Sequence, residues 1–269
     1  MSNPSVPRGA SLESPAQHEE SVKSLYRDQG VAENYIRNRF AWAWSRLLHE
    51  SQIRILNDVI RENRFQTALE IAPGPARIAP DLTGLRSGIM VEASEPMIEV
   101  ARRRLAERDL GRIWEIQHGN AFDLAPLGKT FDFAFTFRFV RHFEERERRR
   151  LYHEIAGRLN PSGLLVFDVV NKPIRARLDA LKSTAPSEAL PVYDVTYTAP
   201  EFREEMSASG FEVVALHPIV RRFGLQSWLS YTVGPRLPRV AWVLVNAIER
   251  VPARDPLEWV AVCRKLGGS

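Results

Sequence analysis

The sequence predicts an α/β protein in which helices cover both faces of a largely parallel sheet. From about residue 66 onward, short runs rich in β-branched and aromatic residues alternate with amphipathic helical stretches, which is typical of this fold class. With 269 residues, 44% of them hydrophobic, the chain can form one large core, and we found no internal repeats. We therefore expect one globular unit with an added cap.

Seven short apolar runs are the predicted strands of this sheet. Their length and their bounding turn residues distinguish them from the longer helical segments. They span residues 66–72, 87–93, 113–119, 131–137, 163–170, 211–218 and 257–265.

Two amphipathic stretches, residues 94–109 and 144–159, are predicted helices. Acidic residues lie near the start of the first and arginines nearer its end, as the helix dipole favours. In the second, glutamates and arginines one turn apart form a charged run, which we interpret as a solvated face rather than a nucleic-acid site. The side chains predicted to face the core are Met97, Val100, Ala101, Leu105, Leu151, Ile155 and Leu159.

The two ends and two long segments are expected to lie outside the regular alternation. Residues 1–18 are rich in Pro, Ser and Gly and are predicted to be a disordered tail, and residues 19–65 form a predicted N-terminal helical cap. Residues 66–269 are the predicted nucleotide-binding domain. Within it, residues 172–200 and 219–256 are predicted cap insertions, because inserts of that length are usually functional covers.

Composition excludes several classes of protein. Cys263 is a single cysteine and the six histidines lack ligand spacing, so we expect neither a disulfide nor a metal site. No segment is long and apolar enough for a membrane span, and no signal peptide is recognisable, so we expect a cytoplasmic, bacterial-type protein, monomeric or homodimeric. The net charge of +4 is modest, and no nucleic-acid partner is expected.

The end of the first predicted strand has small residues at alternate positions. Glu70 is followed by Ala72, Gly74 and Ala76, which would let a ligand approach the main chain closely before a helix that begins near Arg77. An ordinary strand-to-helix turn would give the same pattern.

The second predicted strand ends at Glu92, 22 positions after Glu70. A carboxylate at this strand tip can accept hydrogen bonds from both hydroxyls of a ribose. Ser94 is a predicted N-cap of the following helix, and Met97 is placed to lie against an adenine ring.

These segments together resemble the class I S-adenosylmethionine-dependent methyltransferases that act on small molecules. Residues 70–76 are similar to the acid-x-Gly-x-Gly-x-Gly motif of that family, with two glycines replaced by alanine, and residues 91–105 resemble the segment that follows it. Asn120 after the third strand, the run 131–143 and the turn 159–163 match later motifs in the correct order. The resemblance is clear over 35–170 and implies a seven-stranded sheet whose last strand is antiparallel, with S-adenosylmethionine bound across the carboxyl ends of the first strands and S-adenosylhomocysteine (SAH) as product.

The resemblance also implies which residues bind the donor. Tyr35 would close over it, Arg39 would meet its carboxylate, Glu92 would hold its ribose, and Asn120 would reach its adenine amino group. The full set of implied contacts is Tyr35, Arg39, Glu70, Ala72, Gly74, Ala76, Glu92, Ala93, Met97, Asn120, Ala121 and Phe137.

His142 and Arg138 are the candidate catalytic residues, because they follow the fourth strand where an acceptor would lie. Two other interpretations stay open: methyl transfer can proceed by alignment and desolvation alone, and His142 can simply bond nearby backbone. Asp168 could face the acceptor or be a buried paired carboxylate. Five aromatic residues could either line an acceptor site or simply pack between the helical cap and the core of the domain. These are Trp42, Trp44, Trp228, Tyr231 and Trp242.

We therefore expect a methyltransferase for a small, hydrophobic or aromatic acceptor, with oxygen, nitrogen and carbon all open as the methylated atom. An NAD(P)-dependent Rossmann oxidoreductase is the first alternative, but it would need a small residue where Arg77 stands. A nucleic-acid methyltransferase is the second alternative. The sequence after the fourth strand lacks the Asn/Asp-Pro-Pro-aromatic run used for base amino groups, and Cys263, the thiol that attack on a cytosine ring would need, lies in the last strand, remote from the expected donor site. A non-enzymatic cofactor-binding protein is the third.

Overall fold

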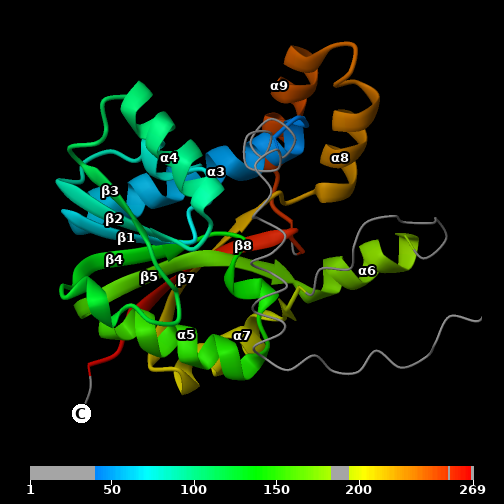
Figure 1. The fold of residues 1–269 in the computed structure, drawn as a ribbon. Helices are drawn as coiled ribbons and strands as arrows, with labels where there is room; N and C mark the ends of the chain where they lie inside the picture. Colours follow the sequence, from blue (N-terminus) through cyan, green and yellow to red (C-terminus); the bar gives the residue numbers. More distant parts are fainter. Residues whose placement is uncertain (1–39, 183–193, 254, 268–269) are drawn as a thin grey trace, which may run out of the picture.

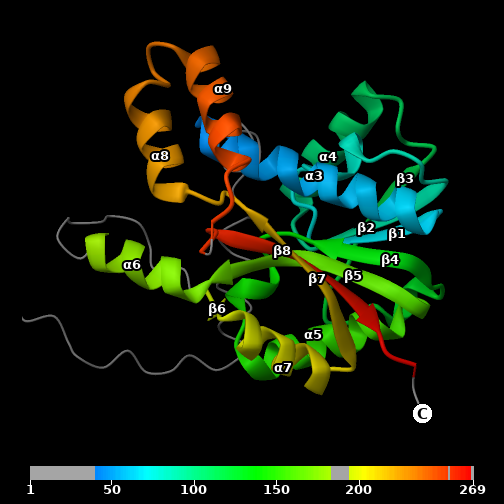
Figure 2. The same cartoon turned by 180° about the vertical axis from the view of Figure 1, so that it is seen from behind.

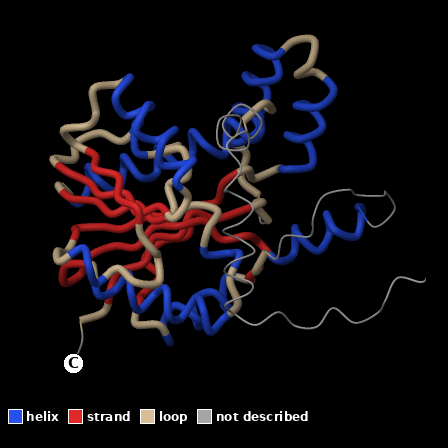
Figure 3. The backbone as a smooth tube through the Cα atoms, in the orientation of Figure 1, coloured by secondary structure: helices blue, strands red, loops and turns tan. Residues whose placement is uncertain are grey.

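The computed structural model describes residues 40–182, 194–253 and 255–267. Its centre is an eight-stranded sheet with helices on both sides, visible as the red layer between blue helices in Figure 3. The strands are β1 (Thr67–Ile71), β2 (Ser87–Glu92), β3 (Trp114–His118), β4 (Phe131–Thr136), β5 (Leu159–Asn171), β6 (Thr196–Tyr197), β7 (Phe211–Ile219) and β8 (Glu258–Lys265).

The order along the sheet is β3-β2-β1-β4-β5-β8-β7, and the two-residue β6 pairs with the end of β5. Strands β1 to β5 pair in parallel, whereas β8 lies antiparallel between β5 and β7. Figure 2 shows β7 and β8 on the side of the sheet opposite β3. The predicted seven-stranded sheet with an antiparallel last strand is thus confirmed, with β6 as an addition that the sequence did not indicate.

Helices pack on each face of the sheet (Figure 1). The longer helices are α3 (Ala43–Asn63), α4 (Glu95–Glu107), α5 (Glu145–Gly157), α6 (Lys172–Lys182), α7 (Ala199–Ala208), α8 (Phe223–Thr232) and α9 (Pro238–Glu249). Side chains of each strand alternate between two cores: Leu164 and Val166 of β5 join the core under α3 and α4, and Leu165 and Phe167 join the core over α5 and α7. The seven residues predicted to face inward from 94–109 and 144–159 are all buried.

The segment after β1 differs from the prediction. No α-helix begins near Arg77; the chain makes a short 3₁₀ turn, η1 (Ala79–Asp81), and then enters β2. Residues 72–86 contain Pro73, Pro75 and Pro80, and four residues of the segment have positive φ, so it lacks the N–H donors and the backbone angles that an α-helix needs. The face that this helix would cover is packed instead by α3, from before β1.

The segments outside the alternation are helical where the structure describes them. Helix α3 lies in the predicted N-terminal layer, α6 begins the first predicted insertion, and α8 and α9 occupy the second. Tyr35 and Arg39 lie outside the described residues, as does the predicted tail. The domain boundaries themselves stay a prediction. Within the described chain, no helix combines the length and the hydrophobicity needed to cross a membrane.

Candidate active site

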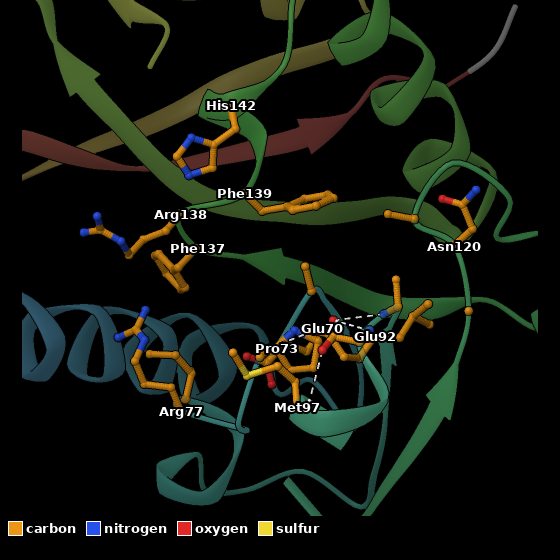
Figure 4. Close-up of a pocket in the computed structure, with 18 of the residues that line it drawn as sticks. Glu70, Pro73, Arg77, Glu92, Met97, Asn120, Phe137, Arg138, Phe139 and His142 are labelled. Atoms are coloured by element: carbon orange, nitrogen blue, oxygen red, sulfur yellow. Dashed lines mark hydrogen bonds between the residues drawn. The ribbon is translucent and has the colours of Figure 1, made fainter. Parts of the chain in front are cut away.

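A cavity opens at the carboxyl ends of β1, β2 and β4, between two walls that Figure 4 shows facing each other. We call one the acidic wall; it consists of Glu70, Glu92 and the loop 72–76 between β1 and η1. We call the other the aromatic wall; it follows β4 and consists of Phe137, Arg138, Phe139, His142 and Phe143. Because parallel strands end at the same edge of a sheet, segments distant in sequence meet here.

The loop of the acidic wall has an unusual backbone. Ala72, Gly74 and Ala76 have φ values of 50°, 58° and 50°, the left-handed region that a Cβ atom disfavours and that only glycine adopts freely. A Cβ added to Gly74 would meet no atom within 4 Å, so this position opens into the cavity. Gly74 therefore suits both the backbone conformation and a ligand close to the main chain, whereas the two alanines hold a strained conformation. Ala72 and Gly74 line the cavity, but Ala76 does not; it is fully buried in the core.

Glu92 ties the two strand ends of the acidic wall together. Its Oε2 accepts a hydrogen bond from Gly74 N at 2.9 Å, and its Oε1 accepts from Ala93 N and Ser94 N, both at 2.9 Å. Burial raises the pKa of Glu92, and these three backbone donors act in the opposite direction. Ser94 caps α4 by accepting from Met97 N, as the sequence predicts. A carboxylate with about four lone-pair sites keeps acceptor capacity toward the cavity.

Glu70 is the second carboxyl group of this wall and is almost fully buried. Burial raises its pKa to about 8, Arg77 lowers it, and Glu92 raises it further. Its Oε2 has no hydrogen-bond partner among the described residues. A buried oxygen without a donor is unfavourable, so a cationic or hydrogen-bonding ligand in the cavity would satisfy it.

Arg77 adds a buried cation at the same end of the cavity. Its Nη1 lies 2.8 Å from His49 Nδ1 and donates to Gln52 Oε1 at 2.9 Å, both on α3. Burial and then Arg77 lower the pKa of His49 to about 4, so His49 is neutral and its Nδ1 accepts from Arg77. The guanidinium also lies 5.8 Å from the ring centre of Phe137. Helix α3 thus positions a positive charge that the sequence alone did not place in the site.

Asn120, Ala121 and Phe122 close the cavity beyond β3. Asn120 Oδ1 accepts from Phe122 N at 3.0 Å, which fixes its side chain in a local turn. The ring of Phe122 packs edge-on against Phe143, and Phe139 packs on Phe143 in the same way, so phenylalanines from two loops form a continuous apolar lining.

His142 lies on the aromatic wall, opposite Glu92 (Figure 4). It ends the 3₁₀ turn η3 (Val140–His142), and its Nδ1 is 3.2 Å from Asp194 Oδ1. Hydrogen bonding to His142 and the charges of Arg141 and His142 hold the pKa of Asp194 below its usual value, against the opposing effect of burial. A carboxylate at Nδ1 orients the ring and selects its tautomer.

Beneath His142, the guanidinium of Arg141 is surrounded by carboxylates. Its Nη1 is 2.8 Å from Glu258 Oε1 and 3.2 Å from Asp168 Oδ2, and its Nε is 3.0 Å from Asp194 Oδ1. Burial alone would lower the pKa of Arg141, but these three carboxylates raise it well above its usual value. Asp168 also accepts from Arg138 N at 2.6 Å, so it is a buried, paired carboxylate that holds the loop after β4.

The structure brings most of the predicted site residues into one cavity. Those that line it are Glu70, Ala72, Gly74, Glu92, Ala93, Met97, Asn120, Ala121, Phe137, Arg138 and His142. Of the cap aromatics, Trp42 and Trp242 line a separate hollow between α3 and α9, while Trp228 and Tyr231 are exposed on α8.

Sequence reasoning missed Arg77, Phe139, Phe143 and Asp194. Arg77 is adjacent to the motif that we recognised, so a signal existed for it. Asp194 is 52 positions after His142 in a segment without a recognisable pattern, and nothing in the sequence linked the two.

One sequence comparison finds a match over part of the chain. Residues 68–163 match a family model described as a methyltransferase domain. A search of curated protein sequences finds no significant match.

Solved structures share the fold at low identity. Magnesium protoporphyrin IX methyltransferase from Synechocystis PCC 6803 with bound SAH aligns with a TM-score of 0.65 and 11% identity, over 92% of this chain and 99% of that one. The DhpI–SAH complex aligns with a TM-score of 0.61 and 18% identity, over 93% and 97% of the two chains. An S-adenosylmethionine-dependent methyltransferase from Clostridium acetobutylicum aligns with a TM-score of 0.56 and 10% identity, over 93% and 99%.

Proposed function

We propose that this chain, whose residues 68–163 match a methyltransferase domain, uses S-adenosylmethionine to methylate a hydroxyl group of a small, apolar or aromatic acceptor. One observation carries the proposal. A single cavity joins the carboxyl groups of Glu70 and Glu92 to a phenylalanine-lined wall that holds a histidine backed by a largely buried aspartate.

The acidic wall has the chemistry to hold the donor. Glu92 would accept hydrogen bonds from the ribose hydroxyls, and the buried Oε2 of Glu70 would accept from the donor's ammonium group. Arg77 is placed to balance a carboxylate at the same end. Met97, Asn120 and Phe122 would surround the adenine. The remaining proposed contacts are Ala72, Gly74, Ala93, Ala121 and Phe137, together with Tyr35 and Arg39 from outside the described residues.

S-adenosylmethionine supplies a methyl group on a positively charged sulfur, which departs as a neutral thioether. The chain's part is to align a nucleophile with that group and to exclude water from it. The rings of Phe139 and Phe143 provide a dry surface against which an apolar acceptor can pack.

His142 is the proposed general base, and Asp194 positions it. With Nδ1 directed at Asp194, the imidazole can take the acceptor's proton on Nε2. Arg138 lies on the same wall, where its charge would stabilise the oxyanion that forms. A base is needed most for a hydroxyl, because a neutral hydroxyl is a weak nucleophile until its proton is removed, whereas a neutral amine can attack before it loses a proton; this favours O-methylation over N-methylation.

A labelled-methyl assay over a panel of acceptors tests the proposal. Phenols and other hydroxylated apolar compounds should accept label, whereas free sugars and short nucleic acids should not. With an active acceptor, His142→Gln should lower kcat about 100-fold and Asp194→Asn about tenfold, without changing SAH affinity, because both act on proton transfer.

The matched control is His153→Gln, an exposed histidine on α5, which should leave kcat unchanged. Transfer to polar acceptors alone, or full kcat in His142→Gln, would contradict the proposal. A loss of SAH affinity in either site variant would instead assign these residues to donor binding.

A further inference from the structure

The hairpin formed by α8 and α9 (residues 221–250, the α8–α9 hairpin) presents large apolar side chains to solvent. Leu225, Trp228 and Tyr231 are exposed on α8, and 57% of the surface of Trp228 is accessible to solvent. Val240, Val243 and Leu244 are exposed on α9, and the accessible fraction of Val243 is 64%. Soluble proteins rarely expose so many large apolar residues on one element unless the surface binds something.

The spacing shows that these residues form outer faces of the two helices. On α8 they lie three positions apart, and on α9 three or four, as expected for one side of a helix. Each helix already buries a different face: Gln226, Leu229 and Ser230 of α8 and Ala241, Val245 and Glu249 of α9 are buried, and Leu229 and Val245 pack together with Leu47 of α3. A helix that already buries one face in the protein has no structural reason for a second, exposed apolar face.

The exposed charged side chains of the α8–α9 hairpin are all arginines. Arg222, Arg236, Arg239 and Arg250 are exposed, and none of them pairs with a carboxylate in the described chain. Glu249 is the single acid between residues 221 and 250, and it is turned inward. Its Oε2 accepts from Gln226 Nε2 and from Arg221 N, both at 2.8 Å.

The helices are too short to cross a bilayer. With 10 and 12 residues they are about 15 and 18 Å long, against about 30 Å of hydrocarbon. Short helices with an apolar face and an arginine rim are suited to lie in the interfacial plane of a membrane.

We propose that the α8–α9 hairpin docks this protein on the surface of an anionic lipid bilayer. The outer apolar faces would enter the headgroup–acyl boundary, and the exposed arginines would contact lipid phosphates. Charge complementarity favours this occupant over two others. A second copy of the hairpin would bring arginines together without carboxylates, and residues 1–39 contain five acidic and five basic side chains and so offer no excess negative charge.

The α8–α9 hairpin and the cavity lie at the same edge of the sheet. The hairpin connects the end of β7 to the start of β8, at the same edge of the sheet at which β1, β2 and β4 end (Figure 1). A docked hairpin would therefore bring this edge toward the bilayer, from which an apolar acceptor could enter. This consequence rests on the proposed function, whereas docking itself does not.

Sedimentation of the full chain with vesicles tests the proposal without donor or acceptor. Vesicles of phosphatidylcholine mixed with phosphatidylglycerol should bind the protein at least tenfold more tightly than phosphatidylcholine alone, and added salt should weaken the binding. The apolar variant Trp228→Ser/Val243→Ser/Leu244→Ser should abolish binding. The charge variant Arg236→Gln/Arg239→Gln/Arg250→Gln should weaken it about 100-fold, since each arginine near an anionic surface contributes roughly a factor of five.

Two control variants carry the same chemical changes elsewhere. Val214→Ser/Leu266→Ser removes exposed apolar residues, and Arg102→Gln/Arg103→Gln/Arg146→Gln removes three exposed charges; both should bind as the unmodified chain does. Thermal unfolding of every variant checks that the fold is retained.

Three results would overturn the proposal. Failure of the folded full chain to sediment with anionic vesicles excludes docking, and equal binding to both vesicle types excludes the role of the arginines. A dimer that light scattering shows to dissociate in the apolar variant would identify a second copy as the occupant. SAH affinity, measured in parallel, reports separately on the proposed function.

Discussion

The two walls of the cavity are built from contacts of different range along the chain. On the acidic wall, Glu92 bonds to Gly74, Ala93 and Ser94, which are 18, 1 and 2 positions away. Behind the aromatic wall, Arg141 bonds to Asp168 and Glu258, which are 27 and 117 positions away. The acidic wall depends on the turns that directly follow β1 and β2, whereas the aromatic wall depends on where the whole sheet places its last strands.

This difference has an energetic side. Glu92 is held by backbone N–H groups of the turns that follow β1 and β2, and it keeps acceptor capacity for a ligand. The Arg141 cluster is a set of buried charges that are stable together and unfavourable apart. We therefore expect changes on the acidic wall to affect binding, and changes behind the aromatic wall to affect stability first.

The largest effect is expected for Arg141→Met. Removing the guanidinium leaves the buried carboxylates of Asp168 and Glu258 without their shared cation, while Asp194 keeps Arg175 and His142, and this should lower the free energy of unfolding by about 3–5 kcal/mol. Chemical denaturation measures this. Arg149→Met breaks an exposed pair with Glu145 and should change stability by less than about 1 kcal/mol. Equal stability of the two variants would mean that the cluster does not organise this wall.

The second prediction concerns the acidic wall. Glu92→Ala should lower SAH affinity about 100-fold, because it removes a charge-assisted acceptor for the ligand and the bond that holds Gly74. Calorimetric titration measures the affinity. The SAH affinity of Glu92→Gln should lie between that of Glu92→Ala and that of the unmodified protein. Glu95→Ala removes an exposed acid from the next helical turn and should bind normally. Unchanged affinity in Glu92→Ala would remove the basis for the proposed donor site.

Features that depend on local sequence could be predicted, and features that depend on contacts between distant residues could not. The strands, α4, α5, and the positions of Glu70 and Glu92 were predictable, because hydrophobic periodicity and strand-end motifs are local. The prediction of a helix near Arg77 was wrong, since three prolines and four residues with positive φ between β1 and β2 outweigh the general strand–turn–helix pattern. The roles of Arg77 and Asp194 in the site could not be predicted, because each depends on a partner brought close by tertiary structure, His49 or His142.

The smallest of these effects is a pH dependence at Glu70. Burial raises its pKa to about 8, so the group is mostly neutral at pH 7. If the donor's ammonium binds there, it favours the ionised form, and SAH affinity should rise about tenfold between about pH 6.5 and about pH 8, with release of a proton. Calorimetry in two buffers of different ionisation enthalpy measures that proton.

Glu70→Gln keeps the shape of the neutral acid and provides the comparison. Its SAH affinity should show no such rise, and no buffer-dependent proton release should accompany binding. The pH dependence of its stability should also be weaker. Because the folded pKa of Glu70 is raised above the unfolded value, the unmodified protein loses stability as pH increases toward 8, and the variant should lose less. A tenfold rise that persists in Glu70→Gln would assign the titration to another group, and the acidic wall would then bind the donor through Glu92 alone.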